Sequence, residues 1–331
     1  MAFDAKVDLL KALNEAKKAG LPTSIKDVDF QKHSIANKEL GLALEKATKI
    51  LFRYEKRRQQ LIKDYSNAAV LKNRTAFGDL VRDDQIIKGI DHELLSVANT
   101  IIHNNLRPSY GISERKVKGP EPILRAFIRV KMDSATRDAE AGNLSGVVKS
   151  LLEARRLPPL TLRDSTYMST FMLTSLERSY YQYLLKLVEK VPSIGMKLPY
   201  SVVAPMTKPG TKEVIRGEFI SSIVNGPYSL GTMVAVPGFP AAKMPKDSAE
   251  QSYFAKEIRN FTAVYRMCGK ANGYSEATRL YRTIEKNLEH VTSGGEKFVL
   301  GPNWMNLLSS FDKMLLVRDE VIKKIGIKKP N

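Results

Sequence analysis

Apolar and polar positions follow a mainly helical period along the chain. Between residues 37 and 65, apolar side chains recur in a 4,3,4,3 rhythm, which places them on one face of a helix. Stop signals occur where such stretches end: Gly20 and Pro22 end a first helix, and Pro192 ends a later one. The pattern predicts helices at residues 3–19, 37–65, 83–104, 122–141, 144–156, 165–191, 248–268, 275–291 and 303–325, the last capped by Asn303.

Residues 198–245 break this helical pattern. Prolines and glycines are frequent there, and β-branched pairs stand between them. We predict a short hairpin arm from Val214-Ile215 and 219–224, followed by a strand at 230–236. A long segment without helix is unusual in a helical chain and is often functional. We therefore interpret it as a protruding or clamp element.

The expected fold class is mainly α, with two helical halves joined by the Pro/Gly-rich segment, in which a short β-hairpin can form. A chain of 331 residues exceeds the usual size of one domain, roughly 100–200 residues. We predict an N-terminal basic helical domain at 1–157, a long connecting helix at 158–197, a Pro/Gly-rich loop or β-arm at 198–247, and a C-terminal helical domain with a basic tail at 248–331.

The chain is strongly basic. It has 53 lysines and arginines against 35 aspartates and glutamates, which gives a formal net charge of +18. Hydrophobic residues make up 43% of the chain, as in ordinary globular proteins, so the charge belongs to a folded body. Such a charge favours phosphate-rich partners. We expect nucleic acid, RNA ahead of DNA, and keep a large protein assembly and an anionic membrane surface as alternatives.

Basic residues concentrate in three parts of the chain. The first runs from an exposed loop expected at 107–120 into the following helix, where Tyr110 and Phe127 lie among the basic residues. Arginine pairs with phosphates through two hydrogen bonds, and aromatic rings stack on bases. The second is the surface of the helix at 37–65, and the third is the C-terminal tail. The pattern of a sequence-reading module is missing, so we expect contacts with the phosphate backbone. The candidate nucleic-acid contacts are Arg53, Lys56, Arg57, Arg107, Arg115, Lys116, Lys118, Arg125, Arg129, Lys131, Lys323 and Lys324.

Motifs for catalysis or cofactor binding are missing from the sequence. Residues 293–297 fail the spacing of a phosphate-binding loop, and residues 142–146 fail the serine-centred spacing of a nucleophile elbow. Four histidines and one cysteine are too few for the usual zinc sites. We interpret Cys268 as a core residue, and His92 and His103 as surface residues that share one helical face. We expect no cofactor, no bound metal and no enzymatic activity.

The sequence favours a non-enzymatic structural protein that coats or packages nucleic acid, as a nucleocapsid-like or virion subunit does, and that associates with itself or with neighbouring subunits. One alternative is a structural subunit of a large capsid or ribonucleoprotein assembly held by protein contacts. Another is a divalent-metal nucleic-acid-processing enzyme, whose scattered carboxylates would converge in the fold. The carboxylates considered are Asp79, Asp83, Asp84, Asp91 and Glu93.

The single cysteine indicates a reducing compartment, because secreted domains usually carry paired cysteines. We expect the cytoplasm or the nucleus, and incorporation into a virion stays open. The N-terminal segment carries Asp4 and Asp8 within its apolar stretch, so it has the pattern of an amphipathic helix and not of a signal peptide. Apolar runs stay well short of the roughly 20 residues needed to span a membrane, and we expect no integral membrane contact.

Overall fold

The structure, a computed structural model, describes residues 4–23, 36–65, 74–106, 121–161, 167–219, 248–288 and 300–326. Within these ranges the protein is helical and contains no strand, which confirms the mainly α fold. The α-helices are α1 (Ala5–Ala19), α2 (Ala36–Asp64), α4 (Arg74–Asp83), α5 (Gln85–His103), α6 (Glu121–Glu140), α7 (Leu144–Ala154), α8 (Tyr167–Lys190), α9 (Pro192–Gly195), α10 (Thr211–Phe219), α11 (Ser248–Cys268), α12 (Tyr274–Ile284) and α13 (Leu300–Ile325). Short 3-10 helices cover Pro158–Thr161, Tyr200–Val202 and Glu285–Asn287.

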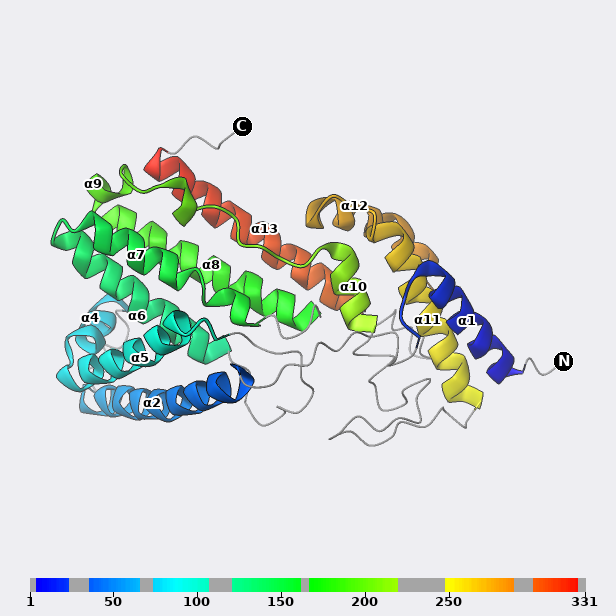
Figure 1. Cartoon of the computed structure of the whole chain (residues 1–331), viewed down its shortest axis with the longest axis horizontal. Coiled ribbons are helices and arrows are strands. Elements are labelled where there is room, and N and C mark those ends of the chain that lie inside the picture. The colour runs from blue at the N-terminus through cyan, green and yellow to red at the C-terminus, as the bar shows by residue number, and fades with distance from the viewer. Residues whose placement is uncertain are drawn as a thin grey trace.

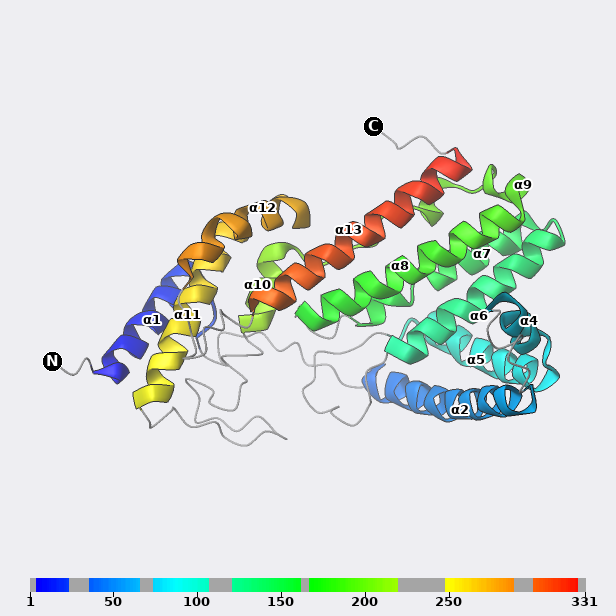
Figure 2. The same ribbon diagram turned by 180° about the vertical axis from the view of Figure 1, so that it is seen from behind.

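The helices form two groups that are connected by α13 (Figures 1 and 2). In one group α2 packs on α5, α6 packs on α7, and α8 lies along α13. In the other group α1 lies along α11, with α12 next to α11. Helix α2 forms the outer edge of the first group, far from α1 in both views. Two successive helices, α1 and α2, therefore belong to different groups, and α1 packs on α11, which is distant from it in the sequence.

Each group has its own hydrophobic core. The first core is built by α2, α5, α6, α7, α8 and the C-terminal half of α13, with Phe127, Tyr180 and Leu184 among its buried residues. The second core is built by α1, α10, α11, α12 and the N-terminal part of α13. Phe311 of α13 packs against both cores. Helix α13 thus contributes to both cores at once.

A buried ion pair lies beside Phe311. Glu177 of α8 is 0% exposed and accepts a hydrogen bond of 3.0 Å from the backbone amide of Met206. Its partner is the ammonium group of Lys208, which also lies 5.5 Å from the centre of the Phe311 ring. Burial lowers the pKa of Lys208, and the charge of Glu177 opposes this effect. The pair therefore ties the segment before α10 to α8 and α13.

Most of the predicted helices are confirmed. The helix predicted at 248–268 has the bounds of α11, and the one predicted at 37–65 differs from α2 by one residue at each end. Helix α13 begins at Leu300, so Asn303 lies inside that helix and is not its cap. The domain boundaries stay predictions.

The predicted hairpin arm is wrong where the structure describes it. Val214 and Ile215 belong to α10, which ends at Phe219, and all three side chains are buried in the second core. Ile215 and Phe219 are four residues apart and share a helical face, so packing against α11 outweighs the β preference of the branched residues. The rest of the proposed arm, 220–247, lies outside the described residues.

The face of α1 that packs against the second core is not the face that carries Val7 and Leu10. Leu9, Ala12 and Ala16 are buried against the second core, whereas Val7 and Leu10 are 43% and 49% exposed. The helix ends at Gly20, whose φ of 92° is a left-handed conformation that favours glycine. On its inner side, the Asp8 carboxylate accepts a hydrogen bond of 2.9 Å from Arg259 of α11.

Candidate nucleic-acid interface

The second predicted basic cluster lies on α2, and packing fixes its orientation. Leu44, Ala47 and Ile50 are buried in the first core, on the side where α2 meets α5. An α-helix turns 100° per residue, so the positions opposite these residues face away from the bundle. The outer side of α2 is accordingly the surface that a partner would meet.

We define the outer stripe as the α2 positions that lie opposite its buried face. They follow one another at spacings of three and four residues, and every one is exposed. Phe52 is 73% exposed, Leu42 is 58% exposed, and Lys49 pairs with Glu45 one turn away, at 3.0 Å. Neither Lys56 nor Lys63 has an ion-pair partner within the described part of the chain. The outer stripe consists of Leu42, Glu45, Lys49, Phe52, Lys56, Gln59 and Lys63.

The two arginines predicted on α2 lie beside this stripe and bind one acid within α5 and one that caps it. Arg53 pairs with Glu93 at 2.6 Å, and Arg57 pairs with Asp84 at 2.7 Å. The arginine hydrogen bonds lower the pKa of both carboxyl groups. The Asp84 carboxylate also accepts a hydrogen bond of 2.9 Å from the amide of Ile87, and so caps the start of α5. These arginines attach α2 to α5, and their charge is partly neutralised.

Arg129 and Lys131, both predicted contacts on α6, are held inside the first group of helices. Arg129 donates two hydrogen bonds to Asp91, of 2.8 and 2.6 Å, and stacks over the ring of Tyr54 at 4.8 Å. Lys131 is buried and binds Asn99 and Glu153. Both side chains connect α6 with neighbouring helices, so a phosphate would have to displace an internal partner to reach them.

The remaining predicted contacts are not brought together with the outer stripe. Arg125 pairs with Glu121 at 2.6 Å and donates to Ser175 and Ser179 of α8. Lys324 binds Glu189, and the end of α13 that carries it lies across the bundle from α2 (Figure 1). Lys323, on the same turn as Lys324, is exposed. The other predicted contacts, Arg107, Arg115, Lys116 and Lys118, lie outside the described residues.

The sequence prediction therefore found part of the outer stripe and omitted the rest. Lys56 is one of the contacts predicted from the sequence, whereas Lys49, Phe52 and Lys63 are not. The signal for them is their spacing: Lys49, Phe52, Lys56 and Lys63 differ by three, four and seven residues, so they share one face opposite the apolar repeat. Phe52, like Leu42, is an apolar residue that does not fit the buried repeat.

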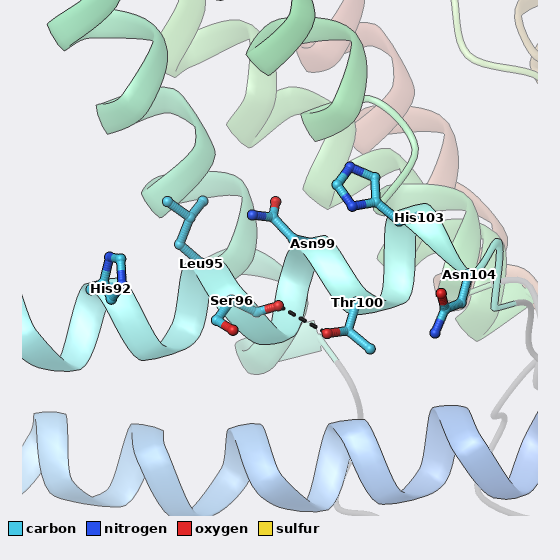
Figure 3. A pocket seen from close by; sticks show the side chains of 7 residues that line it. All are labelled: His92, Leu95, Ser96, Asn99, Thr100, His103 and Asn104. Atoms are coloured by element: carbon cyan, nitrogen blue, oxygen red, sulfur yellow. Dashed lines mark hydrogen bonds between the residues drawn. The ribbon is translucent and has the colours of Figure 1, made fainter.

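The histidines that share a face of α5 line a shallow depression of about 470 Å³ (Figure 3). His92 lies at one end and His103 at the other, eleven residues apart, or roughly 16 Å along the axis. At the second end, the Nε2 atom of His103 lies 3.6 Å from a carboxylate oxygen of Glu153, the same group that binds Lys131. The two imidazoles are too far apart to bind one ion together.

The carboxylates considered for a metal-dependent reaction are mostly engaged by separate arginines. Asp84, Asp91 and Glu93 each pair with a different guanidinium group. In the ranges that the structure describes, no three Asp, Glu, His or Cys side chains gather in a way that could hold a metal ion. The side chain of Asp79 lies outside the described set.

Cys268 is buried at the end of α11, where its thiol lies 3.6 Å from the carbonyl oxygen of Ala277. Burial raises the pKa of this thiol to about 12. A thiol with such a pKa is protonated at neutral pH and is a poor nucleophile. This environment agrees with the interpretation of Cys268 as a core residue.

No described helix combines the length and the apolar content needed to cross a membrane. Comparisons with protein-family models, with curated proteins and with solved structures gave no match. The function is therefore inferred from the residues of this chain alone.

Proposed function

We propose that the protein binds nucleic acid through the phosphate backbone, along the outer stripe of α2, and that it acts as a non-enzymatic coating or packaging protein. The observation that carries this proposal is the position of Lys49, Lys56 and Lys63. These ammonium groups are exposed on one helical face, in a chain with a net charge of +18. Nearby acids such as Glu93 and Asp84 are already paired with arginines.

Binding of this kind is electrostatic and independent of sequence. Each phosphate that a lysine neutralises releases counterions, so the affinity falls as salt rises. Lysine is a flexible point charge without the planar fork of arginine, and contacts with phosphates carry no sequence information. We therefore expect similar affinities for strands of different sequence at the same salt concentration.

The test is the variant K49Q/K56Q/K63Q, which lowers the net charge from +18 to +15. Binding to labelled single-stranded RNA, single-stranded DNA and duplex DNA is measured between 50 and 200 mM salt. For a single strand, loss of three phosphate contacts should make the slope of log affinity against log salt shallower by about 2 and weaken binding roughly tenfold or more.

The matched control is K17Q/K18Q/K313Q, which removes the same charge from exposed positions on α1 and α13. Helices α1 and α13, which carry these lysines, lie away from α2 (Figures 1 and 2). If the control variant loses as much affinity as the α2 variant, net charge alone accounts for binding and the outer stripe is not the interface. If the parent protein binds none of the three nucleic acids, the proposed function is wrong.

The packaging role makes a further prediction about particle size. A coating protein should form larger particles when a long single strand is added, and light scattering follows this directly. Binding without growth of the particles would support a nucleic-acid-binding protein that is not a coat subunit.

A second candidate function is a structural subunit held in an assembly by protein contacts. The observation that favours it is the outer side of α1, where Val7 and Leu10 are exposed one turn apart. Exposed apolar side chains at this spacing are typical of helices that pack on another surface. Sedimentation of V7S/L10S against L316S, which changes an exposed leucine on α13, would test it: only the first variant should shift the protein toward smaller species.

A further inference from the structure

Phe52 is an exposed aromatic ring in the middle of a basic face. Its side chain is 73% exposed, whereas Phe127, Phe219 and Phe261 are buried in the two cores. Its position is fixed by the opposite side of α2, which packs on α5. The ring is consequently presented to solvent by a helix that is itself firmly packed.

The neighbours of Phe52 on the outer stripe are cationic. Lys49 lies three residues before it and Lys56 lies four residues after it, so both share its helical face. The two lysines are seven residues apart, or about 10 Å along the helix axis. Arg53, next to Phe52, is directed to Glu93 at the boundary with α5. The ring is thus flanked on both sides by ammonium groups.

From this arrangement we propose that the outer stripe binds single-stranded nucleic acid, with an unpaired base stacked on Phe52 and the adjoining phosphates on Lys49 and Lys56. The inference rests on the proposed function and adds the class of nucleic acid to it. Aromatic rings stack on the face of any base, and exposed basic side chains follow the backbone. In a duplex the base faces are covered by their neighbours in the stack, so a duplex would use the lysines but not the ring.

A second copy of this chain is the other occupant to be considered, because Leu42 is also exposed on the stripe. Charge favours the nucleic acid: two copies meeting through this face would bring Lys49, Lys56 and Lys63 of each chain together. Like charges in contact oppose association, whereas phosphates compensate them. Self-association through the stripe is nevertheless an outcome that the experiment distinguishes.

The experiment uses the full chain and compares F52A, F52L and F52W with the parent protein. F52L keeps much of the apolar surface but has no π face, so it separates stacking from general apolar contact. L316A is the control, because Leu316 is an equally exposed apolar residue on α13. Affinities for a single-stranded oligonucleotide and for a duplex of the same length are measured at one salt concentration, and circular dichroism checks that each variant is folded.

We expect F52A and F52L to weaken single-strand binding about fivefold or more and to leave duplex binding within about twofold. F52W and L316A should bind the single strand as well as the parent protein or better. The indole introduced by F52W should lose fluorescence when the single strand binds, and the parent protein, whose single tryptophan is Trp304, supplies the baseline.

The inference is overturned if F52A binds the single strand like the parent protein, or if it weakens single-strand and duplex binding equally. It is also overturned if F52A changes the particle size without nucleic acid and leaves the affinities unchanged, which would assign the stripe to self-association. A different result would contradict the proposed function itself: K49Q/K56Q/K63Q would then bind both nucleic acids no more weakly than K17Q/K18Q/K313Q.

Discussion

Basic side chains between helices and basic side chains on the outer stripe of α2 occupy contrasting environments. Arg129, Lys131 and Lys208 are enclosed by neighbouring helices and bind carboxylates. Lys56 and Lys63 extend from one convex helical face into solvent. The first group contributes to stability through its internal partners, and the second remains available to an external anion. Net charge alone would count both groups as binding residues.

The largest effect on stability is expected from K208M. This substitution removes the cation and leaves the fully buried carboxylate of Glu177 without its ion-pair partner. Removing one member of a buried pair costs about 3–5 kcal/mol, because the remaining charge stays desolvated. Urea unfolding measures the loss in the free energy of unfolding.

The control for that prediction is the double variant E177Q/K208M. Its neutral amide can still accept the hydrogen bond from Met206, so the double variant should be more stable than K208M. A loss of less than about 1 kcal/mol in K208M would contradict the prediction and place the ammonium group in a better solvated site.

A smaller loss of stability is expected from R129M. The change removes two hydrogen bonds to Asp91 and the contact with Tyr54, so we expect a loss of about 2–3 kcal/mol in the free energy of unfolding. R125M is the matched control on the same helix, where the pair with Glu121 is more exposed, and it should cost at most about 1 kcal/mol. Equal losses of stability in R129M and R125M would show that the more enclosed ion pair contributes no more than the exposed one.

The pair of Arg57 and Asp84 should make stability depend on pH at the acidic end. The Arg57 hydrogen bond lowers the pKa of Asp84 in the folded state below that of the unfolded chain. The pair therefore contributes its full stability above the unfolded value of about 3.9, and this contribution is lost as pH falls through that value toward the lower folded pKa. D84N keeps a good helix cap but has no charge to protonate. Thermal melts from pH 6 to pH 3 should fall less steeply for D84N, and parallel curves would show that the pair is not coupled to folding.

The smallest effect on stability is expected from K49Q/K56Q/K63Q. These side chains are exposed, and among the described residues the variant affects just the one-turn ion pair of Lys49 with Glu45, so the free energy of unfolding should change by no more than about 0.5 kcal/mol. K131M should lower the free energy of unfolding by more than the triple variant does, because Lys131 is buried and its loss leaves Glu153 without the ammonium group that it binds. A large loss of stability in the triple variant would mean that the outer stripe serves the fold, and its effect on binding would need another explanation.

The sequence predicts helices where the apolar period is long and regular. For α2 and α11 it locates the ends to within a residue. It fails at α10, where Val214 and Ile215 favour a strand but are covered by the second core. It also does not predict α4, whose residues 74–83 carry only three large apolar side chains. Short segments take their structure from the surfaces that they contact, which local patterns do not contain.

Candidate contacts were harder to predict than helices because their partners are distant in the chain. Arg129 binds an aspartate 38 residues away, and Lys131 binds a glutamate 22 residues away. The sequence around each basic residue does not show these partners, so both side chains look like free charges until the chain is folded. The buried face of α1 is hard to predict from the sequence for a related reason. Its contact with α11 is made through Ala12 and Ala16, whose small side chains allow close approach but give a weak apolar signal.

The contact between α1 and α11 also bears on the order in which the chain acquires its structure during synthesis. Asp8 and its partner Arg259 are separated by 251 residues. At a translation rate of about 5–20 residues per second, α1 leaves the ribosome roughly 12–50 s before the surface that buries Leu9 has been made. Until then Leu9, Ala12 and Ala16 have no surface to pack against, so we expect chaperones to bind this inner face of the nascent helix, which α11 covers in the finished protein.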